Sequence, residues 1–88
     1  MSIIEKISIS IAEYLALNSI RGLEEDAHML VMTAQRTKNG YYVLSGSSET
    51  FDSLASYISE DIYYETLPAK ELKQLRKLLE RLEPDIDL

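Results

Sequence analysis

Apolar residues near the start of the chain recur at the spacing expected of one side of a helix. They are Ile3, Ile4, Ile7, Ile11, Tyr14 and Leu15. Ser2, followed three residues later by Glu5, is a typical helix start, because the two side chains satisfy backbone N–H groups that the first turn leaves unpaired. The pattern therefore predicts a helix over residues 3–18.

The same stretch also fits a strand. Ile7, Ser8, Ile9, Ser10 and Ile11 alternate between apolar and polar, as in a strand with one buried face. We favour the helix because residues 12–17 are mostly good helix formers and continue the pattern.

Residues 23–37 fit two structures. Leu23, Ala27, Leu30 and Ala34 recur at helical spacing, whereas residues 28–33 are equally typical of a strand. Asn39-Gly40 is a strong hairpin signal, because a type I′ turn needs positive φ at both central residues. It is followed by the strand formers of residues 41–44. We therefore predict a hairpin of residues 28–37 with 41–46, and a helix capped by Asn-Gly is the alternative.

The second half of the chain predicts two helices. Ser47 or Ser48 caps the first, over residues 48–62, and its apolar residues are Phe51, Leu54, Ala55, Ile58 and Ile62. A connector over residues 63–67 leads to Pro68, a residue that favours the first helical turn. The second helix runs over residues 68–82 with leucines on one side, and Pro84 ends it. Residues 83–88 form an acidic tail.

The resulting element order is α-β-β-α-α in a single small α+β domain. A hairpin of two strands is marginal alone, so the helices are expected to pack against it.

Composition narrows the function classes. The 88 residues include no cysteine, which removes disulfides, thiolate zinc sites and thiol nucleophiles. The N-terminal residues do not match a signal peptide, and no apolar stretch approaches the length of a membrane span. We expect a cytoplasmic protein with no membrane partner.

Charge is unevenly distributed. The net charge is −6, yet residues 67–82 carry five basic and two acidic side chains. On a helix, Lys70, Lys73, Lys77 and Arg81 form a basic stripe opposite the leucines. A solvated helix face is the plain explanation, and docking to an acidic partner or to phosphates is the functional one.

No residue pattern indicates catalysis, a metal or a cofactor. His28 is the one histidine, and its acidic neighbours Glu24, Glu25 and Asp26 match no metal motif. Residues 45–48 do not form a nucleophile elbow, and no phosphate-binding glycine motif is present. We therefore expect no enzyme activity.

Tyrosine is the other unusual feature, with six residues in the chain. Two adjacent pairs, Tyr41-Tyr42 and Tyr63-Tyr64, are candidates for a contact surface, because tyrosine combines apolar area with a polar tip. We expect a small interaction module that acts on a protein partner as a regulator, adaptor or inhibitor, and that forms a homodimer. The alternative is a dimeric nucleic-acid-binding regulator that uses the basic stripe.

Overall fold

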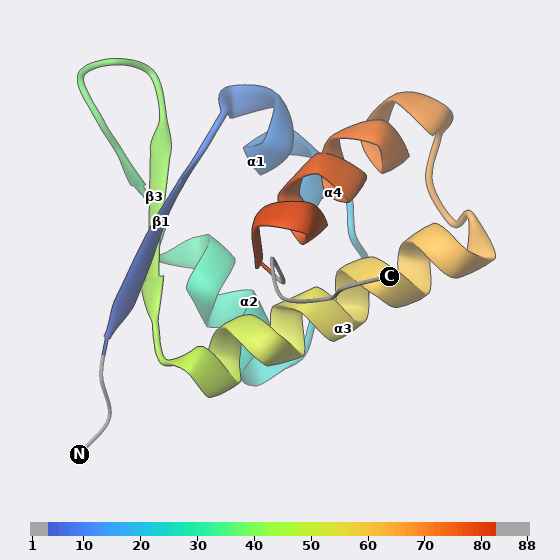
Figure 1. Ribbon diagram of the computed structural model, residues 1–88, viewed down its shortest axis with the longest axis horizontal. Helices are drawn as coiled ribbons and strands as arrows, with labels where there is room; N and C mark the ends of the chain where they lie inside the picture. The colour runs from blue at the N-terminus through green and yellow to red at the C-terminus, as the bar shows by residue number, and fades with distance from the viewer. Residues whose placement is uncertain (1–3, 83–88) are drawn as a thin grey trace.

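The computed structural model describes residues 4–82, which fold into an α+β arrangement of three strands and four helices (Figure 1). In chain order the elements are β1 (Glu5–Ile9), α1 (Ile11–Asn18), α2 (Glu25–Met32), β2 (Gln35–Arg36), β3 (Tyr42–Gly46), α3 (Ser48–Tyr64) and α4 (Ala69–Leu82). The antiparallel sheet has the order β1-β3-β2, so the central strand is β3. All four helices lie to one side of this sheet (Figure 1). The expected α+β class is confirmed, with the difference that a strand precedes the first helix.

The first half of the predicted helix over residues 3–18 is wrong. Residues 5–9 form β1, which pairs with β3 so that Ile7 lies opposite Leu44 and Ile9 opposite Tyr42. The alternation of apolar and polar residues decides this segment, because pairing with β3 buries Ile9 on the helix-covered face. The predicted cap at Ser2 lies outside the described residues.

Helix α1 begins only after Ser10. The Ser10 hydroxyl accepts a hydrogen bond from the Glu13 N–H at 3.1 Å, and the Glu13 carboxylate accepts one from the Ser10 N–H at 2.8 Å. This reciprocal pair is a capping box, and it stands at the point where the alternating pattern gives way to helical spacing.

The predicted strand over residues 28–37 is also wrong in most of its length. Residues 25–32 form α2, which buries Ala27, Leu30 and Val31 on one side, and only Gln35–Arg36 pair with β3. The expected Asn39-Gly40 type I′ turn is absent, since only Gly40 has positive φ, at 82°. Residues 37–41 form the connection instead, closed by a hydrogen bond from the Thr37 N–H to the Tyr41 carbonyl.

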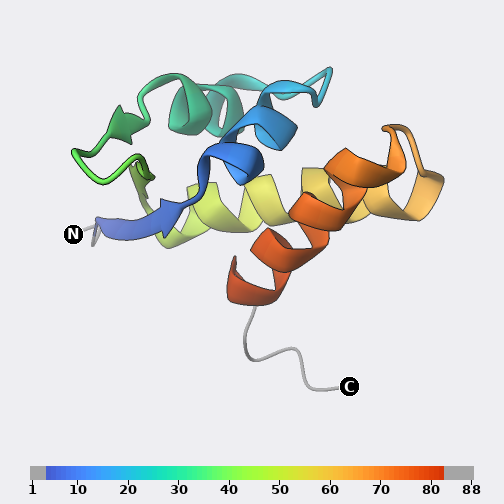
Figure 2. The same cartoon turned by 90° about the horizontal axis from the view of Figure 1, so that it is seen from above.

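Helices α3 and α4 pack side by side as a helical hairpin (Figure 2). The Ser47 hydroxyl caps α3 by accepting from the Thr50 N–H, and α3 ends at Glu65, whose φ is 49°. Because α3 extends to Tyr64, residues 63 and 64 belong to its last turn and not to the expected connector. The Pro68 carbonyl accepts the first hydrogen bond of α4, from the Leu72 N–H. Leu54, Ile58, Leu75 and Leu78 are fully buried at the centre of the core.

One ion pair, between a buried acid and a partly exposed arginine, connects the two ends of the described chain. The Arg81 guanidinium at the end of α4 lies 2.6 Å from Glu13 Oε1 and also donates to the Ser8 carbonyl of β1 at 3.0 Å. Glu13 is 6% exposed and is the one buried charged residue in the described part of the chain. Arg81 therefore neutralises Glu13 and fixes α4 against both β1 and α1.

We expect Arg81→Ala to lower the free energy of unfolding by about 1–2 kcal/mol, because it leaves the buried Glu13 carboxylate without its cation. Urea denaturation followed by circular dichroism measures the change. Lys77→Ala is the matched control on the same helix and is expected to shift the free energy by no more than about 0.5 kcal/mol. Equal losses in the two variants would show that the Glu13 contact contributes nothing specific.

Candidate functional site

The tyrosine pairs expected at a contact surface are placed differently from one another. Tyr42 stacks on Tyr14 of α1, with ring centroids 3.8 Å apart and ring planes 5° apart, and it packs against the core. This ring joins the sheet to α1. Tyr41 lies in the hairpin connection and is half exposed.

Tyr63 and Tyr64 both project from the last turn of α3. Their side chains are 78% and 67% exposed, and their rings meet edge to face at 4.9 Å. These two rings remain available for contact, whereas Tyr42 is largely committed to the fold.

The basic stripe that the sequence predicts on α4 differs from the exposed basic residues of the structure at two positions, Arg81 and Arg76. Arg81 turns toward Glu13 and Ser8, so its charge is occupied within the molecule. Lys70, Lys73 and Lys77 are exposed, and Arg76 is exposed on the same helix. We call Lys70, Lys73, Arg76 and Lys77 the basic face. None of these four side chains forms an ion pair with another described residue.

The sequence did not indicate that apolar residues lie on the outward sides of the two short helices. Ile11 and Leu15 of α1 are exposed, as are Met29 and Met32 of α2. In each helix the buried residues lie opposite them: Ala16 and Leu17 in α1, and Ala27 and Val31 in α2. We call Ile11, Leu15, Met29 and Met32 the outward apolar residues. A helical-wheel plot would have shown them, but only with the correct boundaries of α1 and α2.

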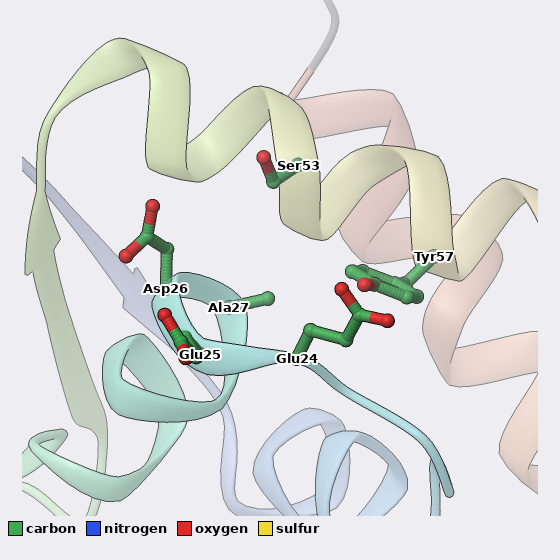
Figure 3. Close-up of a pocket in the computed structure, with 6 residues that line it drawn as sticks. All are labelled: Glu24, Glu25, Asp26, Ala27, Ser53 and Tyr57. Atoms are coloured by element: carbon green, nitrogen blue, oxygen red, sulfur yellow. The ribbon is translucent and has the colours of Figure 1, made fainter.

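A polar hollow of about 420 Å³ lies between the start of α2 and the middle of α3 (Figure 3). We call it the acidic hollow. It is lined by Glu24, Glu25, Asp26, Ala27, Ser53 and Tyr57, and none of these residues is basic. Figure 3 shows the Glu24 carboxylate beside the Tyr57 ring and Asp26 extending toward α3. The sequence placed the three acids together but gave no sign that Ser53 and Tyr57 would join them.

The acidic hollow raises the pKa of Tyr57, which forms part of its wall. Partial burial raises the pKa of the Tyr57 phenol, and the nearby Glu24 carboxylate raises that pKa further, because both disfavour the phenolate. A hydrogen bond from the Glu24 backbone acts in the opposite direction. The net effect is that the phenol stays neutral to a higher pH than a free tyrosine does.

The described residues show no arrangement of side chains that could hold a metal ion. Within residues 4–82, no group of three or more His, Cys, Asp or Glu side chains is placed to hold a metal ion. His28 is exposed on α2 and joins none of the side-chain hydrogen bonds found in this range. Across the same residues, no helix has the length and apolar character needed to cross a membrane.

Comparison with known proteins gives no match to a family model, to a curated protein or to a solved structure.

We expect Glu24→Gln to lower the pKa of Tyr57, because it removes the nearby negative charge. Nuclear magnetic resonance titration of ring-labelled tyrosine measures this pKa directly. Since the pKa is raised in the folded protein, the contribution of Tyr57 to stability is present below its ordinary pKa of 10.0 and is lost as the pH rises through the folded value. Glu25→Gln is the control and should leave the pKa of Tyr57 unchanged. A Tyr57 pKa that does not move in Glu24→Gln would contradict the assigned cause.

Proposed function

We propose that this chain is a small non-enzymatic interaction module that acts in the cytoplasm as a regulator, adaptor or inhibitor of a protein partner. The observation that carries this proposal is the exposure of the outward apolar residues Ile11, Leu15, Met29 and Met32. Tyr41, Tyr63 and Tyr64 add exposed aromatic area elsewhere on the surface.

Outward apolar residues are unusual on short helices that already bury their inner side. A helix packed on a core normally presents polar or charged residues to water. Leu15 is 58% exposed and Met32 is 64% exposed, although residues opposite them are fully covered. Removal of such side chains from water is favourable, at about 25 cal/mol per Å² of apolar area. A partner surface that covers them would gain that free energy.

The helices also supply suitable contact residues. Ile11 and Leu15 are one turn apart on α1, so a partner can contact both along one line. Methionine adapts its shape to different surfaces, because it is unbranched and polarisable. Ile11 lies beside the hairpin connection, where a Cβ added to Gly40 would be 3.8 Å from Ile11 Cδ1. Tyr41, which follows Gly40 directly, is also exposed.

A dimeric nucleic-acid-binding regulator is the second candidate function. Its support is the exposure of Lys70, Lys73 and Lys77 on α4. The occupation of Arg81 by Glu13 weakens it, since phosphate contacts depend on the number of available cations. The acidic net charge of −6 also opposes the approach of a polyanion.

The test of the interaction proposal places a photo-crosslinking amino acid at Leu15 of the otherwise native chain in its own cells. We expect one discrete adduct, identified by mass spectrometry. Adding Ile11→Glu should remove that adduct, because it puts a charge into the contact. Ser59→Glu, on the exposed side of α3, is the control and should preserve the adduct.

The same variants are checked for folding by urea denaturation. Ile11→Glu is expected to change the free energy of unfolding by no more than about 0.5 kcal/mol, because Ile11 is already exposed. If no adduct forms at Leu15, or if the adduct persists unchanged in folded Ile11→Glu, the outward apolar residues are not the contact surface.

A further inference from the structure

The basic face of α4 is a concentrated positive charge without a partner in the described molecule. Lys70, Lys73, Arg76 and Lys77 are all exposed and none is ion-paired with a described residue. Glu80 is the one acidic residue that shares this side of α4. Side chains three and four positions apart are neighbours on a helix, so these like charges repel one another. Contact with an anionic surface would relieve that repulsion.

The acidic hollow carries the negative charge that would complement the basic face. Glu24, Glu25 and Asp26 supply three carboxylates, and the Tyr57 ring forms part of the wall (Figure 3). Carboxylates beside an aromatic ring recognise an ammonium or guanidinium group, through ion pairing and through attraction to the ring face. A hollow of about 420 Å³ has room for the end of a lysine or arginine side chain.

The two surfaces cannot meet within one molecule. The acidic hollow lies between α2 and α3, whereas α4 packs on α3 and α1. In Figure 2, α2 lies on one side of α3, and the C-terminal end of α4 extends to the other side. Each copy of the chain therefore presents a basic face on one side and an acidic hollow on the other.

We propose that the basic face of one copy docks into the acidic hollow of a second copy. The second copy is favoured because its acidic hollow brings three carboxylates and an aromatic wall directly against the basic face, so that the local attraction acts where the two surfaces meet. This contact joins two different surfaces, so each added copy leaves one of each surface free. The assembly therefore grows head to tail, or closes into a ring, and does not stop at a two-fold dimer. It is independent of the outward apolar residues.

Salt dependence is the first consequence. Charge attraction between surfaces is screened over about 10 Å at 0.1 M salt, so association should weaken as salt increases. In sedimentation equilibrium at about 0.05 M salt, the average mass should rise above the monomer mass of 10.0 kDa as concentration increases. At about 0.5 M salt the average mass should return toward that of the monomer.

Two neutralised variants test the contact itself. Lys73→Gln with Lys77→Gln removes charge from the basic face, and Glu25→Gln with Asp26→Asn removes charge from the acidic hollow. Each variant alone should sediment as a monomer. An equimolar mixture should form a one-to-one heterodimer that does not grow further, because only one intact basic face and one intact acidic hollow are then present in each pair.

The control for the acidic hollow is Glu49→Gln with Asp52→Asn, which neutralises two exposed acids in the first turns of α3. The control for the basic face is Lys6→Gln with Lys38→Gln, and both controls should associate as the wild type does. Circular dichroism establishes that each variant is folded.

A wild type that stays at 10.0 kDa, or a mixture that stays monomeric, would overturn the proposal. A closed dimer that is unaffected by the variants would also overturn it. In a parallel titration with a mixed-sequence DNA duplex, binding by a monomeric wild type that is lost in Lys73→Gln with Lys77→Gln would assign the basic face to nucleic acid instead. No shift of the duplex, together with heterodimer formation in the mixture, supports the proposal.

Discussion

The contact between Glu13 and Arg81 links the final helix to both the first strand and the first helix. Glu13 begins α1 as half of a capping box, and the same carboxylate oxygen receives the Arg81 guanidinium. Arg81 also satisfies the Ser8 carbonyl on the outer edge of β1. A sheet edge with unpaired backbone groups invites pairing with other chains, and a charged side chain placed there discourages it. One side chain therefore orients α4, neutralises a buried acid and protects an edge strand.

The basic residues of α4 therefore fall into two groups, one that contacts the rest of the fold and one that is free to contact a partner. Arg81 is paired with Glu13 and Ser8, while Lys70, Lys73, Arg76 and Lys77 are exposed without an ion-pair partner among the described residues. Tyrosine divides in the same way, because Tyr42 stacks on Tyr14 whereas Tyr63 and Tyr64 remain exposed. A residue type that is typical of interfaces indicates a contact surface only where the fold has not already used its side chain.

Local patterns predicted the α+β class and the two long helices, α3 and α4. In these helices the capping residues and the apolar spacing indicate the same structure over many residues. Local patterns failed where two of them overlapped. Ile7 and Ile9 fit a helix or a strand, and the choice depended on β3, which lies far along the chain. Ala27, Leu30 and Val31 fit helical spacing, but the nearby Asn39-Gly40 signal favoured a strand. The acidic hollow and the role of Arg81 could not be predicted, because Tyr57 and Glu13 reach their neighbours only through tertiary packing.

The long reach of Arg81 also bears on how the protein is made. Its partners Ser8 and Glu13 are among the first residues of the described chain to be synthesised, and Arg81 is among the last. β1 can pair with β3 only after residues 42–46 have also been synthesised. While synthesis proceeds, the Ser8 carbonyl lacks its Arg81 donor, and the Glu13 carboxylate has only the local Ser10 N–H as a partner. The cap, the strand edge and the final helix can be joined through Arg81 only after this residue has been synthesised, so this contact is among the last to form.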